Sequence, residues 1–195
     1  MSESSRRELL KAIAAAALIG PVGLEAAQHV HGIAAAEKSA AGYKPKALTA
    51  HEYKTLRVLA DLIIPADERG PGAADAGASE FIDLLASQNP RLLAIYTGGI
   101  AWLDRSSQRL NSKDFVDATP QQQNALLDLI AYRKNESPML GPGIQFFDWA
   151  RRMVVDAYYT SPAGIKAIGY LGNTAVSKFE IPQEAIDYAV KRSPV

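Results

Sequence analysis

The sequence contains no cysteine among its 195 residues. This absence excludes disulfides, thiolate metal sites, iron–sulfur ligation and the attachment motif of a c-type haem. A lack of disulfides commonly indicates a cytosolic protein. It agrees equally well with a protein that folds in the cytoplasm and is exported afterwards, because disulfides would not form before export.

The chain also lacks an excess of charge of either sign, since 21 Lys and Arg balance 21 Asp and Glu. A neutral chain exerts no overall attraction on nucleic acid or anionic lipid. Two small basic clusters, Arg133-Lys134 and Arg151-Arg152, have no interleaved aromatic residues. We therefore expect these clusters to face solvent or a protein partner, and we expect no nucleic acid as a partner.

No hydrophobic run is long enough for a good membrane span. The mild apolar run from Ala12 to Leu24 has 13 residues, is rich in alanine and is broken by Gly20, Pro21 and Gly23. As a helix it would rise about 20 Å, short of a hydrocarbon core of about 30 Å. The charged head and apolar body are instead typical of a secretory signal.

The head of this segment reads Ser5-Arg6-Arg7-Glu8-Leu9-Leu10-Lys11. It is similar to the twin-arginine consensus, with Leu9 in place of the commoner phenylalanine, and such signals direct the export of folded proteins. We expect residues 1–36 to be a twin-arginine signal read through Arg6 and Arg7, with a candidate cleavage site at Ala34-Ala35-Ala36. The alternative is an amphipathic N-terminal helix with a chance arginine pair.

The rest of the chain divides into a flexible linker at residues 37–47 and a single helical domain at residues 48–195. Capping-box spacing at Thr49…Glu52 and Thr119…Gln122 predicts two helix starts. Pro65 ends the first helix, and Ser79 is expected to cap a helix over residues 80–87. Further helices are expected at residues 90–110, 144–159, 162–168 and 182–192, with loops at residues 65–78 and 137–143.

No stretch alternates as a strand would, so the predicted fold is all-α. We expect an irregular bundle of about six to seven helices with long loops rich in glycine and proline. The pair Gly98-Gly99 is expected either to kink its helix or to let another element come close.

Chemistry-bearing residues are few. His51 is the only histidine left after cleavage at Ala36, and it lies in the first turn of a helix with no signature of a catalytic triad around it. His29 and His31 lack the further ligands of a metal site. The acidic loop with Asp67, Glu68 and Asp75 does not have calcium-loop spacing. We therefore predict no catalytic, cofactor-binding or metal-binding residue in this chain.

Tyrosines near the end of the domain are the best candidates for contact with a partner. Tyr158 and Tyr159 are adjacent, so they point to different faces of a helix, and one is expected in the core and one outside. Exposed tyrosine is enriched at protein interfaces.

Several stretches together resemble the gluconate 2-dehydrogenase subunit 3 family over about residues 48–173. They are Leu62-Ile63-Ile64-Pro65-Ala66-Asp67, Pro71-Gly72-Ala73-Ala74-Asp75-Ala76-Gly77, Phe81-Ile82-Asp83, Tyr158-Tyr159-Thr160-Ser161-Pro162, Gly164 and Gly169-Tyr170-Leu171-Gly172-Asn173. Within these stretches, we take Tyr158, Tyr159, Tyr170 and Asn173 as the candidate partner interface.

The resemblance implies a non-catalytic small subunit of a periplasmic sugar or glycoside dehydrogenase complex. Its large partner would be a flavoprotein of the glucose–methanol–choline (GMC) oxidoreductase type that carries FAD, and a cytochrome c subunit often takes the electrons onward. The leader would carry both subunits through the twin-arginine translocase, and the small subunit would support maturation of the large one, either free in the periplasm or membrane-associated through the complex. The alternatives are a periplasmic helical module that binds a small ligand and a stand-alone exported enzyme that uses His51 or the acidic loop.

Overall fold

The computed structural model describes residues 3–38, 42–170 and 180–193, and the described residues form helices and loops without a strand. The α-helices are α1 (Glu3–Ala16), α2 (Leu24–Glu37), α3 (Ala50–Ile63), α4 (Ala78–Ala86), α5 (Pro90–Asn111), α6 (Pro120–Ile130), α7 (Gly141–Thr160), α8 (Pro162–Ala167) and α9 (Gln183–Arg192); the 3-10 helices are η1 (Phe115–Asp117) and η2 (Arg133–Asn135). Seven of the α-helices, α3 to α9, begin after residue 48. The prediction of an all-α bundle of six to seven helices is therefore confirmed.

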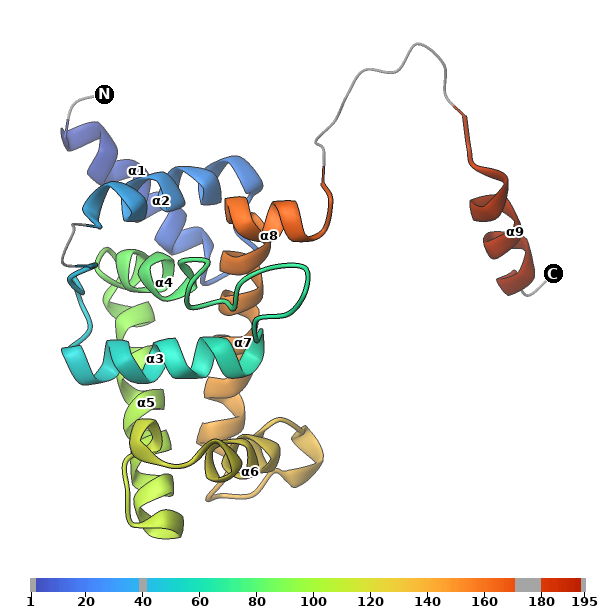
Figure 1. Ribbon diagram of the computed structural model, residues 1–195. Coiled ribbons are helices and arrows are strands. Elements are labelled where there is room, and N and C mark those ends of the chain that lie inside the picture. Colours follow the sequence, from blue (N-terminus) through green and yellow to red (C-terminus); the bar gives the residue numbers. More distant parts are fainter. Residues whose placement is uncertain (1–2, 39–41, 171–179, 194–195) are drawn as a thin grey trace.

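The body is built around the short helix α4. All nine residues of α4 are buried, and α1, α2, α3, α5 and α7 all pack against it. Figure 1 shows α5 and α7 running the length of the body with α3 crossing them, while α6 closes the lower end. Among the described residues, the largest fully buried side chains are Tyr96, Phe81 and Phe115.

Local capping signals placed two helices correctly. The hydroxyl of Thr49 accepts from the N–H of Glu52, and Thr119 does the same for Gln122. In both boxes the third-position side chain bonds back to the N–H of the capping residue, as predicted. The prediction that Pro65 ends the first helix is confirmed, because α3 stops at Ile63.

Two predicted helix starts were wrong. Helix α4 is preceded by Gly77 in the left-handed region (φ +90°), and Ser79 lies inside the helix instead of capping it. Glycine accepts this φ without steric cost, so no side-chain cap is needed for the chain to enter α4 in this way. Helix α7 begins at Gly141 and takes in Pro142, which we had placed in a loop, because proline is tolerated in the first turn.

The glycine pair in α5 does not interrupt the helix, which is continuous from Pro90 to Asn111. A Cβ atom added to Gly99 would overlap the ring of Phe146 in α7, whereas one added to Gly98 would meet nothing within 4 Å. Gly99 therefore allows α7 to come close to α5.

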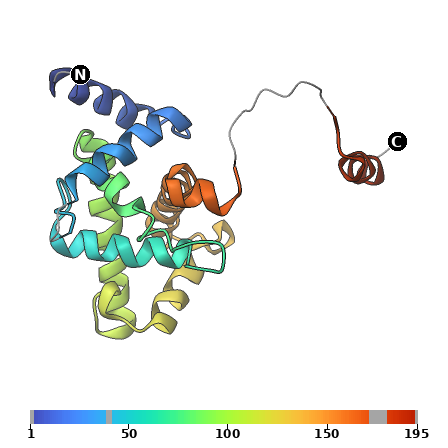
Figure 2. The same ribbon diagram turned by 45° about the horizontal axis from the view of Figure 1, so that its top comes forward.

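The predicted export signal forms two helices that lie on the body. Arg6 and Arg7 belong to α1, and Leu10, Ile13 and Ala14 of the same helix are buried. Figure 2, turned to bring the top forward, shows α1 and α2 crossing one end of the bundle. Among the residues that the structure describes, no helix is both long enough and apolar enough to cross a membrane.

Helix α9 lies apart from the other helices in both views (Figures 1 and 2). All of its residues are exposed, including Ile186, Tyr188 and Val190.

Candidate functional site

The loop between α3 and α4, residues 64–77, is closed by hydrogen bonds within the loop and to Asp61 of α3. A carboxylate oxygen of Asp61 accepts the N–H of Ala74 at 2.9 Å, and the N–H of Ala73 donates to the carbonyl of Ile64 at 2.9 Å. Asp67 accepts from the N–H of Gly70 at 3.1 Å, which shapes the tip of the loop. The Ile64–Asp67 and Pro71–Gly77 stretches therefore build one folded loop.

The connection between α7 and α8 is a tight corner, which we call the α7–α8 corner (residues 158–170). The buried Ser161 hydroxyl donates to the carbonyl of Tyr158 at 2.7 Å and accepts from the N–H of Gly164 at 3.0 Å. A Cβ atom on Gly164 would overlap the backbone carbonyl of Tyr158, so this position requires glycine. Pro162 begins α8, where its missing N–H is not needed.

The loop and the corner touch each other. A Cβ atom on Gly70 would lie 3.1 Å from the hydroxyl of Tyr158 and 3.4 Å from the Cβ of Ala167. Burial raises the pKa of Tyr158, and the negative charge of Asp67 raises it further. Stretches about 90 residues apart in the sequence thus form one continuous face.

The predicted division of the tyrosine pair is confirmed. Tyr158 is buried, while Tyr159 is 42% exposed, and their rings meet edge to face at 5.0 Å between centroids. Tyr170 is 44% exposed. Asn173 lies outside the described residues. The exposed candidates for partner contact at this corner are therefore Tyr159 and Tyr170, with Tyr158 supporting Tyr159 from the core side.

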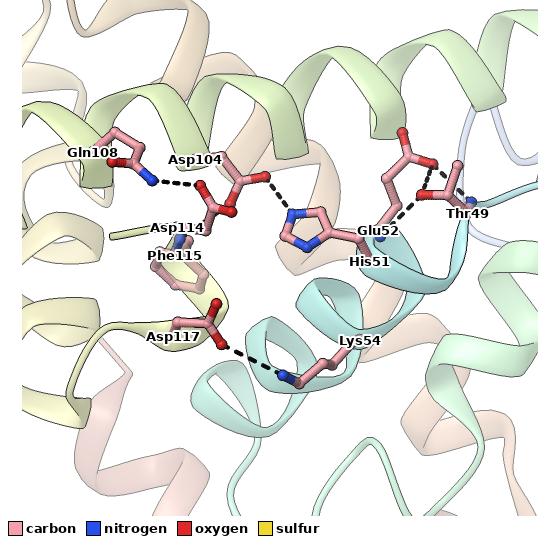
Figure 3. A network of polar contacts seen from close by, with 9 residues as sticks. All are labelled: Thr49, His51, Glu52, Lys54, Asp104, Gln108, Asp114, Phe115 and Asp117. Carbon is pink, nitrogen blue, oxygen red and sulfur yellow. Dashed lines mark hydrogen bonds and ion pairs between the residues drawn. The ribbon is translucent and has the colours of Figure 1, made fainter. Parts of the chain in front are cut away.

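His51 belongs to a network of polar contacts on another part of the body, drawn in Figure 3. Its Nε2 lies 2.7 Å from a carboxylate oxygen of Asp104, and the other oxygen of Asp104 accepts the N–H of Phe115 at 3.0 Å. A hydrogen bond to Asp104 raises the pKa of His51. The sequence pattern around His51 gave no indication of this partner.

The network joins helices and does not resemble a catalytic arrangement. The nearby hydroxyl of Thr49 is engaged with Glu52 in the capping box (Figure 3). Among the hydrogen bonds of the described residues, none joins His51 to a hydroxyl. A nucleophile activated by this histidine is therefore not part of the observed geometry.

The acidic residues of the 64–77 loop do not converge. Asp67 is used by the turn of its own loop, while Asp75 pairs with Arg57 of α3 at 3.0 Å. Glu68 is exposed at the loop tip. No group of three or more acidic or histidine side chains among the described residues could hold a metal ion.

The basic clusters, which are separate in sequence, meet at one carboxylate. Arg151 and Arg152 of α7 and Arg133 of η2 lie 3.3, 3.8 and 3.8 Å from oxygens of Asp148. The guanidinium of Arg152 also lies over the ring of Trp149, 4.6 Å from its centroid. The positive charge is thus partly neutralised within the surface that carries it.

A cavity of about 520 Å³ lies between α2, the start of α4 and α8. Its volume is in the range of small-ligand sites, and its lining is mainly apolar. Charged and polar members of the lining include His31 of α2, Lys38 directly after α2, Asp75 of the 64–77 loop and Glu80 of α4. This cavity is not predicted from the sequence, because α2 is expected there to be part of the export signal.

The family described as Gluconate 2-dehydrogenase subunit 3 matches residues 50–177, more than half of the chain. The matched range contains all of helices α3 to α8, including the folded loop and the α7–α8 corner. Comparisons with curated proteins and with solved structures found no match.

Proposed function

Since the chain belongs to the gluconate 2-dehydrogenase subunit 3 family, we propose that it is the non-catalytic small subunit of a periplasmic FAD-dependent sugar or glycoside dehydrogenase complex. Its partner is a large flavoprotein of the GMC oxidoreductase type, which holds the FAD and carries out the oxidation. A cytochrome c subunit is a further candidate member. This chain itself contributes no catalytic residue and binds no cofactor.

The observation that carries this proposal is the family match over the part of the chain that builds the 64–77 loop and the α7–α8 corner. The resembling residues there form one hydrogen-bonded face, at which Tyr159 and Tyr170 are exposed. Aromatic side chains on a rigid support lose little conformational freedom on binding, which favours them as anchors of an interface. We assign this face to the flavoprotein.

The second part of the proposal concerns export, and it rests on the N-terminal segment. Arg7 is exposed at the start of α1, within the arginine pair that resembles a twin-arginine signal. We propose that the translocase exports the folded small subunit together with the bound large subunit, and that the small subunit stabilises the large one while it matures.

The test is purification of the C-terminally tagged chain from the periplasm and membranes of its native host. We expect a large co-purifying protein with flavin absorption. A variant with Arg6→Lys and Arg7→Lys should leave both proteins in the cytoplasm while the complex still forms. A single colourless protein under gentle conditions would contradict the subunit assignment, and unchanged export of the double variant would contradict the export route.

One observation favours a second candidate, a module that binds a small ligand: the apolar cavity of about 520 Å³ beside α2. Saturable binding of a small molecule by the isolated chain, without any flavoprotein, would support this candidate over the first. Loss of that binding in an Ala35→Trp variant, which places a large side chain on the cavity lining, would locate the ligand there.

A further inference from the structure

Helix α2 packs as part of the body, although the sequence assigns it to the end of the export signal. Five of its residues are buried against the body: Ala27, Val30, His31, Ile33 and Ala34. Helix α2 packs against α4 and α7 of the body, and also against α1. The ring of His31 lies against that of fully buried Phe81, with 4.8 Å between centroids.

Polar contacts at its C-terminal half join α2 to three other parts of the fold. The Nε2 of His31 lies 3.2 Å from the hydroxyl of Thr160, at the end of α7. Lys38, directly after α2, lies 3.8 Å from the buried carboxylate of Glu80. Glu37 accepts from the ammonium of Lys46 at 2.8 Å. Helix α2 is therefore held by side chains as well as by apolar contact.

The protonation state of His31 is compatible with permanent burial. Desolvation by burial lowers its pKa to about 4, so the ring is neutral at neutral pH. A neutral imidazole can stack on Phe81 and share a hydrogen bond with Thr160 without a buried charge.

Cleavage after Ala36 would remove α1 and nearly all of α2. Helix α4, whose nine residues are all buried, would then lose its cover on that side, and Phe81 would become exposed. A large apolar patch uncovered in this way is a liability for a soluble protein.

The candidate cleavage motif is also poorly placed for a protease. Residues Ala34 to Ala36 lie within α2, and Ala34 is 5% exposed. Proteolysis favours exposed, irregular chain. The connection between α1 and α2, residues 17–23, is irregular, and Ile19 within it is 91% exposed.

We propose that residues 24–37 remain in the mature protein as a permanent helix, which braces α4 and the α7–α8 corner. Any leader that is removed ends before Leu24. This proposal depends on the proposed export in one respect: only an exported chain would have a leader to remove.

The first test is the mass and N-terminal sequence of the tagged chain purified from the periplasm. We expect a first residue at or before Leu24. A first residue at Glu37, or anywhere within α2, would overturn the proposal. Protein confined to the cytoplasm would contradict the proposed export instead, and the stability measurement below would then decide the role of α2.

The second test places the same charge at a buried and at an exposed position of α2 in the full chain. Ala27 is fully buried, whereas Ala35 is exposed. We expect Ala27→Asp to lower Tm by about 10 °C or more, and Ala35→Asp by no more than about 3 °C. If Ala27→Asp cannot be recovered as folded protein while Ala35→Asp folds, the outcome also supports the proposal, because it means that the buried charge destabilises the fold even more strongly. Equal melting of the two variants would overturn the proposal, because it would mean that α2 does not belong to the cooperative fold.

Discussion

His51 of α3 and Asp104 of α5 are joined through a contact of 2.7 Å between the imidazole Nε2 and a carboxylate oxygen. The second oxygen of Asp104 accepts the N–H of Phe115 at the start of η1. One carboxylate therefore connects three elements that are distant in sequence. The side chain of His51 is 43% exposed, so this contact lies close to solvent.

The first prediction follows from the raised pKa of His51, whose largest cause is the hydrogen bond to Asp104. A histidine with a raised folded-state pKa contributes stability that is fully present below the unfolded value of about 6.5 and is lost as pH rises through the folded value. Compared with His51→Gln, the wild type should be more stable by at most about 1 kcal/mol at pH 5 and by less at pH 8. Urea unfolding of both proteins across this range measures the difference, and a difference that grows with pH would contradict the assignment.

The second prediction uses the glycine pair of α5. Gly99→Ala should destabilise the protein by about 1–3 kcal/mol, because the new methyl group would overlap Phe146. Gly98→Ala is the matched control: the position is exposed with open space around it, and alanine should stabilise the helix by about 0.5–1 kcal/mol. Chemical denaturation of the two variants should give shifts of opposite sign. Shifts of the same sign would mean that α5 and α7 do not pack as closely as described.

Much of the fold could be predicted because its signals are local. Thr49 and Thr119 bond within their own first turns, so the spacing of two residues was enough to place each helix start. The start of α4 at Gly77 could not be predicted in this way. Its left-handed backbone replaces a side-chain cap, and sequence spacing alone favoured Ser79 instead.

The candidate site was harder to predict because its contacts join distant residues. The alternation of Tyr158 and Tyr159 follows from helix geometry alone. In contrast, the partner of His51 lies 53 residues away and that of His31 lies 129 residues away. Such pairs depend on how the helices are arranged in space, and no spacing rule in the sequence contains that information. Gly164 is among the residues that carry the family resemblance, but the reason why this position requires glycine, the nearby carbonyl of Tyr158, is visible only in the structure.

The third prediction concerns Asp83, a fully buried carboxylate in α4 that anchors the segment before α3. It accepts the hydroxyl of Tyr43 at 2.9 Å and the N–H of Lys46 and Leu48 at 2.6 and 2.8 Å. Asp83→Ala should cost at least about 2 kcal/mol, because several donors lose their acceptor. Asp83→Asn keeps one acceptor oxygen and should cost less. Hydrogen exchange at Lys46 to Leu48 should accelerate most in the alanine variant, and exchange no faster than in the wild type would contradict the anchoring role.

The last prediction tests the face assigned to the flavoprotein. Tyr159 and Tyr132 are both exposed tyrosines, 42% and 56% respectively, but only Tyr159 projects from the α7–α8 corner. The ring of Tyr132 is instead approached by the ammonium of Lys134, 5.2 Å from its centroid.

If Tyr159 is an anchor of the interface, Tyr159→Ala should weaken the complex on the order of tenfold, whereas Tyr132→Ala should leave it unchanged. Flavin absorption per tagged chain, measured after purification under identical conditions, reports the amount of bound partner. Tm of the isolated variants is the necessary companion measurement, because Tyr159 also contacts buried Tyr158, and a misfolded corner would lower the yield for a different reason. A Tyr159→Ala protein with wild-type Tm and wild-type flavin content would move the interface away from this corner. An unchanged Tm with a reduced flavin content would mean that the exposed ring itself binds the partner.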